Sequence, residues 1–249
     1  MKKIVLASFM TFAAIAAANA APQTLTRTPA GYNVTYQYQD QPQIKNWYVG
    51  GKLMGNYTMF TIKRSSDNPT VNADFASQSN SGLQLGAAAF VGTKGIFGLA
   101  DDSWRAELEL GYLGKYTNPN SSGLDESIQA PYALVSANWN TAEQKWGWFY
   151  IGAGVGAAMP MTTVTSHDPT LLFTGGDTQT NVSVLVAGML GYRVHIADNW
   201  FLDIGYKFMA FDGGSRTNQY SVASGTFNLT EKFGWVMNHS INVGVAWEF

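Results

Sequence analysis

The feature that constrains this chain most is an alternation of apolar and polar residues that recurs, strand length by strand length, from Trp47 onward. Such an alternation places apolar side chains on one face of an extended strand and polar ones on the other. It is clearest in residues 104–112, where apolar positions interleave with Arg105, Glu107 and Glu109. Helical periodicity is nowhere convincing, so the sequence predicts an all-β fold.

Alternating segments and their connections suggest one topology. The segments cover residues 47–59, 83–91, 104–112, 133–139, 149–157, 182–194, 200–208 and 241–249. Long polar connections alternate with shorter turns: the long ones are residues 63–80, 117–126, 160–180 and 212–234, and the short ones lie near residues 93–103, 140–145 and 197–199. This asymmetry is typical of outer-membrane barrels. We predict that residues 46–249 form an eight-stranded antiparallel transmembrane up-and-down β-barrel with long extracellular loops and short periplasmic turns.

The N-terminus has the features of a secretory signal peptide. Two lysines precede an uncharged, mostly apolar run that extends to Ala18, and small residues stand at Ala18 and Ala20. We expect cleavage after Ala20, which makes residues 1–20 the signal peptide and residues 21–45 a periplasmic leader. An uncleaved anchor helix is the alternative.

Residues 31–39 of the leader also alternate, but a ninth strand would break the even strand number of bacterial barrels. The favoured interpretation is a periplasmic segment that pairs locally or lines the barrel mouth. The alternative is a ten-stranded barrel with a further strand near residues 221–229.

The composition argues against several classes of function. The 15 Lys and Arg fall to 13 when Lys2 and Lys3 are removed with the signal peptide, so 13 against 17 acidic residues leaves a net charge of −4. This mild charge attracts no polyanion, and we expect no nucleic-acid partner. The chain has no cysteine and three histidines in distant segments, so we expect no metal site and no cofactor.

The apolar face could point outward to lipid or inward to a ligand, as in a soluble carrier barrel. Aromatic residues at the strand ends favour lipid, because aromatic side chains concentrate at membrane interfaces. The predicted periplasmic belt comprises Trp47, Trp104, Trp139, Trp148, Trp200 and Trp247. The predicted outer belt includes Tyr57, Tyr112 and Tyr206.

The polar face then points into the barrel. Its charged members nearly balance in sign: Lys52, Arg105, Glu107, Glu109, Lys115, Arg193, Asp203, Lys207 and Glu248. Buried charge is tolerated only when it is paired, and eight strands enclose just enough space for side chains to fill. We predict an ion-pair network in a filled lumen, which argues against an open pore.

Several segments carry a resemblance to a known family. They are residues 47–53, 104–112, 150–156, 190–193 and 203–207. They resemble strands of the OmpA-type and opacity-type small barrels of the porin-family outer-membrane proteins. The resemblance implies a location in the cell outer membrane and variable surface loops. The terminal residues are similar to the family's signal for the barrel-assembly machinery: Val243, Val245, Trp247 and Phe249.

The resemblance does not fix an activity, and the first hypothesis is a non-enzymatic surface protein that serves envelope integrity, adhesion or contact with host molecules or lipopolysaccharide. The implied partners are outer-membrane lipid and lipopolysaccharide, the assembly machinery, and host or cell-surface ligands. One alternative is a lipid A-modifying enzyme, for which His239 and Ser240 are an adjacent pair of suitable types, although neighbours on a strand face opposite sides. The other alternative is a narrow channel.

A basic pair, Lys63 and Arg64, lies at the base of the first predicted loop. Such a pair either contacts phosphates of the outer leaflet or is simply solvated. The sequence favours solvation.

Overall fold

The computed structural model describes most of the predicted barrel. It describes residues 47–67, 77–95, 103–119, 124–141, 146–166, 172–173, 178–222 and 225–249. The predicted signal peptide, the leader and the alternating segment 31–39 lie outside the described residues.

Every regular element in these ranges is a β-strand. The strands are β1 (Trp47–Ser66), β2 (Gln78–Lys94), β3 (Trp104–Pro119), β4 (Leu124–Asn140), β5 (Gly147–Ala158), β6 (Met161–Ser166), β7 (Leu172–Phe173), β8 (Thr178–Thr180), β9 (Ser183–Ala197), β10 (Trp200–Val222) and β11 (Gly225–Glu248). No helix in the described part of the chain has the length and apolar character needed to cross a membrane.

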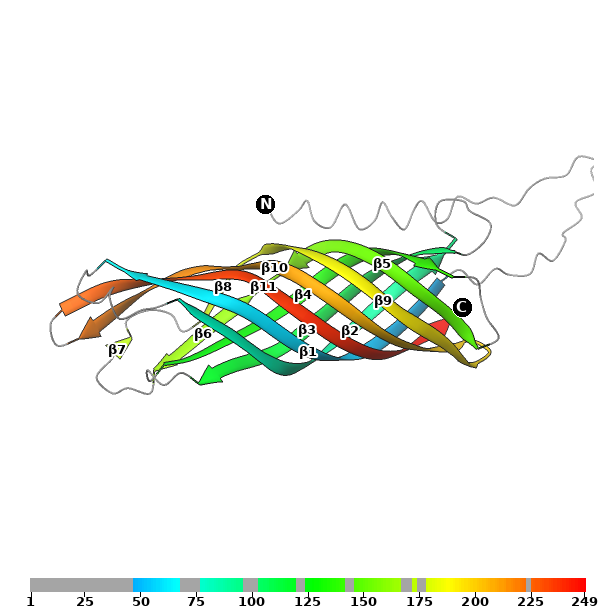
Figure 1. Cartoon of the computed structure of the whole chain (residues 1–249), viewed down its shortest axis with the longest axis horizontal. Helices are drawn as coiled ribbons and strands as arrows, with labels where there is room; N and C mark the ends of the chain where they lie inside the picture. Colours follow the sequence, from blue (N-terminus) through cyan, green and yellow to red (C-terminus); the bar gives the residue numbers. More distant parts are fainter. Residues whose placement is uncertain are drawn as a thin grey trace, which may run out of the picture. The chain divides into compact units, whose positions relative to one another are not determined.

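Eight of the strands form a closed antiparallel ring in the order β3-β2-β1-β11-β10-β9-β5-β4, and β4 pairs back with β3 (Figure 1). The first and last strands of the barrel meet along the β1–β11 ladder, where Tyr48 pairs with Glu248. The backbone N–H of Phe249 donates to the carbonyl oxygen of Trp47 at 2.9 Å. The predicted eight-stranded up-and-down barrel is therefore confirmed.

The strands are much longer than a bilayer needs. A membrane-spanning strand takes about 9–11 residues, whereas β1 has 20, β10 has 23 and β11 has 24. The β10–β11 hairpin extends well past the β9–β10 ladder, which stops at Phe211 and Leu185 (Figure 1). Of the short strands, β6 pairs with β4 and with β8, and β7 pairs with β10.

The prediction of a loop at residues 212–234 is wrong, because most of the described residues in this region form strands. Its outward positions, such as Asn228, Thr230 and Lys232, are polar and made the segment look like a loop. Its inward positions are buried, so the alternation persists beyond the lipid-facing region. Residues 221–222 and 225–229 belong to the β10–β11 ladder, which rules out a separate further strand there.

The outward face carries a continuous apolar band. Its most exposed members include Leu85 at 85 %, Leu83 at 80 % and Leu53 at 73 %. Water would penalise a patch of this extent, while a lipid-facing barrel requires one. Closed barrels of this type occupy the outer membrane, so the predicted outer-membrane location is confirmed.

Most of the predicted interface aromatics lie on this outward face. Exposed members are Trp47, Trp139, Trp200, Trp247, Tyr57 and Tyr112, while Trp104 and Tyr206 are half-buried. The assignment of Trp148 is wrong, because its side chain is 5 % exposed and packs against Phe201 inside the barrel. Phe149 takes the outward position, since neighbouring strand residues point to opposite faces.

Three tyrosines in the lumen each lie against a glycine on the adjacent strand. The cross-strand pairs are Tyr48 with Gly92, Tyr132 with Gly111, and Tyr150 with Gly191. A Cβ atom at any of these glycines would overlap the facing tyrosine ring. Glycine therefore leaves the space in which each ring lies flat against the barrel wall.

We expect Gly111→Ala to lower the free energy of unfolding by about 1–3 kcal/mol, because the added methyl displaces the Tyr132 ring from Glu109. The measurement is urea unfolding in detergent micelles, followed by tryptophan fluorescence. The matched control is Gly188→Ala, where an added Cβ meets no atom within 4 Å. Equal unfolding midpoints for the two variants would contradict the prediction.

Candidate functional site

A buried ion cluster fills the half of the lumen next to the β9–β10 turn, the end predicted to be periplasmic. We call it the inner cluster, and its charged members are Lys52 on β1, Arg105, Glu107 and Glu109 on β3, Arg193 on β9, and Asp203 and Lys207 on β10. Each is 7 % exposed or less. The three members on β3 lie two residues apart and so share the inward face of that strand.

Glu107 and Asp203 are linked by one arginine. The Arg193 guanidinium donates to Glu107 Oε1 at 2.6 Å through Nη2 and to Asp203 Oδ2 at 2.9 Å through Nε. Glu107 also accepts a hydrogen bond from the Tyr48 hydroxyl at 2.8 Å, and Asp203 accepts one from Tyr150 at 2.8 Å. Both carboxylates thus have charged and neutral donors, as buried carboxylates require.

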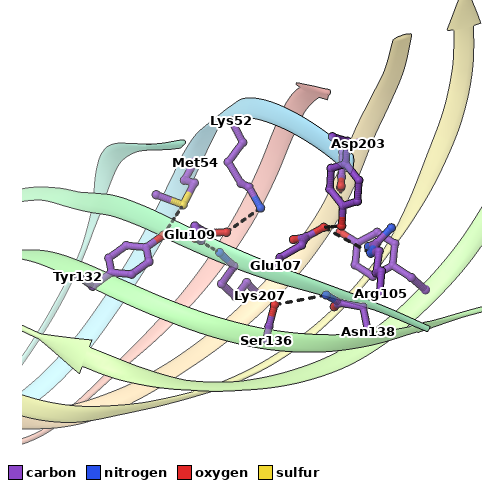
Figure 2. Close-up of polar contacts among 12 residues, drawn as sticks. Lys52, Met54, Arg105, Glu107, Glu109, Tyr132, Ser136, Asn138, Asp203 and Lys207 are labelled. Atoms are coloured by element: carbon purple, nitrogen blue, oxygen red, sulfur yellow. Dashed lines mark hydrogen bonds and ion pairs between the residues drawn. The ribbon is translucent and has the colours of Figure 1, made fainter. Parts of the chain in front are cut away.

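Glu109 is the acceptor of a second group. Lys52 Nζ lies 2.7 Å from Glu109 Oε2, and both Lys207 and the Tyr132 hydroxyl donate to the other carboxylate oxygen. Figure 2 shows Lys52 and Lys207 converging on this carboxylate beside Tyr132. The inner cluster therefore consists of two sets of charges, one around Glu107 and Asp203 and the other around Glu109.

Two predicted lumen charges lie outside the inner cluster. Glu248 is buried at the end of β11 and accepts from Lys94 at 2.7 and 2.8 Å, a partner that the sequence does not indicate because Lys94 falls in a predicted turn. The lumen assignment of Lys115 is wrong, because its side chain is exposed. A bulge between Tyr112 and Lys115 reverses the parity of the strand, and Gly114 permits it with a φ of 93°.

Polar and then apolar layers follow above the inner cluster. Asn56, Thr58 and Asn238 are joined by hydrogen bonds of 2.7 and 3.1 Å. Above them lies an apolar plug of buried side chains: Phe60, Ile62, Ile128, Phe211, Phe233 and Val236. A cavity of about 10 Å³, lined by some of these residues, has room for about one water molecule.

A second buried ion cluster lies on the other side of the plug, toward the β10–β11 hairpin and the end predicted to be extracellular. We call it the outer cluster, and its members are Arg64 on β1, Glu126 on β4, Arg216 on β10 and Glu231 on β11. Glu231 accepts from Arg216 Nε at 2.6 Å and from Arg64 Nε at 3.0 Å. Arg64 also pairs with Glu126 and contacts Gln78 Oε1 on β2 at 3.3 Å.

The outer cluster joins strands above the lipid-facing band. Outward residues at this level, such as Ser65 and Thr230, are polar. The expectation that Arg64 is solvated is wrong, because its side chain is 6 % exposed and faces inward. Arg216 and Glu231 are not among the predicted site residues, because the polar outward residues around them make their segment resemble a loop. The alternation of the segment is nevertheless a signal for strands.

Glu126 lies in an environment that favours the protonated carboxyl group more than water does. Burial and the neighbouring Glu231 carboxylate raise the pKa of Glu126 from 4.5 to about 6, and Arg64 only partly opposes them. The outer cluster therefore changes its charge in mildly acidic medium.

The candidate enzymatic pair does not form a dyad. His239 faces outward and its Nδ1 lies 2.6 Å from the Tyr206 hydroxyl, whereas Ser240 is fully buried on the inward face. Among the described residues, no group of three or more His, Asp or Glu is arranged to hold a metal ion.

The predicted assembly signal lies on the outward face at the C-terminal end of β11 and includes the residue that follows the strand. Val243, Val245, Trp247 and Phe249 are between 39 % and 51 % exposed. The Trp247 and Phe249 rings stack with centroids 5.1 Å apart. Their accessibility is compatible with recognition, and the assembly role stays a prediction.

Comparison with known proteins gives similarities in fold. No protein-family model matches the chain, and no curated protein sequence matches it. Neisserial surface protein A is 16 % identical over 82 % of this chain and 97 % of its own, with a TM-score of 0.46. OprG of Pseudomonas aeruginosa is 14 % identical over 83 % and 100 %, with a TM-score of 0.43. Ail of Yersinia pestis is 9 % identical over 78 % and 97 %, with a TM-score of 0.36. By name, one is a surface protein, one an outer-membrane protein and one an attachment protein.

We expect Glu107→Gln to lower the free energy of unfolding by about 3–5 kcal/mol, because it leaves Arg193 and Arg105 buried without a full counter-charge. The measurement is the urea midpoint of the folded band on unboiled gels. Glu248→Gln at the more exposed periplasmic mouth is the control, with an expected loss of about 1 kcal/mol. Equal losses of unfolding free energy in the two variants would contradict a larger contribution of the inner cluster to stability.

We also expect the extracellular ends of the strands to become more stable as the pH falls through about 6. The folded state binds the Glu126 proton more tightly than the unfolded chain does, so acidification favours the folded state by about 2 kcal/mol and the gain ends below pH 4.5. The measurement is amide hydrogen exchange in the β10–β11 hairpin, corrected for intrinsic rates. Glu126→Gln should remove the pH dependence, and a dependence that persists in this variant contradicts the assignment.

Proposed function

We propose that this protein is a non-enzymatic outer-membrane protein whose extracellular end contacts molecules outside the cell. The observation that carries the proposal is that the lumen is filled at successive levels while the strands continue beyond the lipid-facing band. A filled barrel offers its surroundings no route through the membrane, so its accessible surface is the extracellular end.

The layers of the lumen support this proposal over a channel. An ion or solute would have to displace the inner cluster, the hydrogen-bonded asparagines and then the apolar plug. Opening this path removes partners from several buried charges at once, which costs several kcal/mol for each.

The long β10–β11 hairpin supports a role in contact. Its outward positions carry Ser, Thr, Asn and Gln side chains, and the Thr217 and Thr230 hydroxyls lie 2.9 Å apart. Its inward positions are fixed by the outer cluster and by buried Phe227 and Leu229. A rigid polar surface of this kind suits contact with polar ligands, because little conformational freedom is lost on binding.

The test is to shorten the hairpin without disturbing the barrel. Residues 218–229 are replaced by Asn-Gly, so that a two-residue turn joins Thr217 and Thr230, which are cross-strand partners. The measurement is the adhesion of expressing bacteria to cultured epithelial cells, and we expect about a tenfold loss, equivalent to about 1.4 kcal/mol. The control changes Asp198 and Asn199, in the short turn between β9 and β10, to Asn-Gly.

Both variants are first checked for the faster gel mobility of an unboiled barrel. Unchanged adhesion by the shortened, folded barrel would contradict a contact role for the hairpin. A second measurement records the wild-type protein in planar lipid bilayers, where we expect no single-channel steps. Steps that change in amplitude in Glu107→Gln would favour the channel alternative.

A further inference from the structure

Two lysines meet on the outward face where β1 pairs with β11. Lys63 and Lys232 are cross-strand partners and both are exposed. Directly opposite side chains on a sheet lie about 5 Å apart at Cβ, and like charges in this position destabilise the pair. The next pair along the ladder is Arg64 with Glu231, which points inward and forms an ion pair. The same two strands therefore neutralise charge on one face and concentrate positive charge on the other.

The described part of the chain offers these lysines no carboxylate. The acidic neighbour on β11, Glu231, faces the lumen and binds both Arg64 and Arg216. Asp67, the nearest acid further along the outward side of β1, accepts from the backbone N–H and Nδ2 of Asn228, each at 2.8 Å. A bound anion would therefore neutralise the positive charge that the described acidic residues leave on this pair.

The lysine pair also lies at the level of lipid headgroups. Along β1 toward its C-terminal end, the side chains that face away from the lumen change from Tyr57 and Met59 to Thr61 and Lys63. On β11 the corresponding change runs from Met237 and the 61 % exposed Trp235 to Lys232. The last apolar outward residues therefore lie immediately below the lysines, where an interfacial aromatic residue is expected.

We propose that Lys63 and Lys232 bind a phosphate group in the headgroup of an anionic outer-leaflet lipid. A phosphate placed between the two ammonium groups replaces their repulsion with two charge-assisted hydrogen bonds. Thr61 precedes Lys63 by two residues on β1, so the two side chains share the outward face of that strand. The headgroup is favoured over a soluble anion because lipid fills the space directly below the pair, next to Trp235.

This inference rests on the proposed function only for its orientation, with the long strand ends outside the cell. It makes the lipid itself a specific partner of the barrel wall, separate from any ligand of the hairpin tip. Binding would fix the barrel's depth and hold a lipid against the β1–β11 ladder, which closes the ring.

The test uses the full barrel, refolded in detergent and titrated with lipid A that carries both phosphates. Native mass spectrometry counts the bound lipid. We expect Lys63→Gln/Lys232→Gln to weaken binding about thirtyfold, because each lysine near an anionic lipid surface contributes about fivefold. The double variant also removes a repulsive pair, so it should fold at least as well as the wild type.

The matched control is Lys115→Gln, since Lys115 is also exposed but lies opposite Gln129. It should change binding less than twofold, within the small effect of an isolated surface charge. Lipid A without phosphates should bind the wild type as weakly as phosphorylated lipid A binds the double variant. Equal binding by the wild type and the double variant would overturn the proposal.

Displacement of lipid A by millimolar inorganic phosphate would overturn the choice of a headgroup, because a site for the free anion needs no lipid. The hairpin experiment separates this result from the proposed function. Shortening the hairpin between Thr217 and Thr230 leaves both lysines in place but removes Asn228, the partner of Asp67, so the shortened variant also carries Asp67→Asn. Adhesion and lipid binding can then fail independently.

Discussion

The β1–β11 ladder is the interaction on which the rest of the structure depends. Inside lipid no water satisfies a free backbone group, so a sheet can cross a membrane only when its two edges pair. Here that pairing joins the two ends of the barrel sequence, from Tyr48 with Glu248 to Ser66 with Leu229. Closure creates a lipid-facing outside and a narrow inside at once, and it determines the environment of every side chain on the strands.

Closure of the ring buries charged side chains in the lumen, and in this barrel they lie in separate layers. The inner cluster contains four cations and three carboxylates, and three tyrosine hydroxyls donate to these carboxylates as well. Each tyrosine needs a glycine beside it to lie flat against the wall. The apolar plug then separates this cluster from the outer cluster, so neither set of charges faces open water on both sides. A lumen filled in this way favours the stability of the barrel over the passage of ions or solutes.

Much of the candidate site was predictable because strand parity is simple. On β3, alternation alone placed Arg105, Glu107 and Glu109 on one inward face, where the structure has them. Parity also explains the errors. Trp148 was assigned by its nearness to a turn and not by its parity with Phe149, and Lys115 follows a bulge that reverses the count. The outer cluster was missed because polar outward residues above the lipid band made residues 212–234 look like a loop.

By itself the sequence determined the all-β class, the number of barrel strands and the two faces of each, because the period of side chains along a strand is fixed by its geometry. Only the tertiary structure decided which charges meet. Arg193 contacts Glu107 across 86 residues, and Arg64 contacts Glu231 across 167. Those contacts depend on register and on the stagger of the closed ring, and so does the meeting of Lys63 with Lys232. A local pattern fixes the direction of a side chain, but ring closure selects its neighbours.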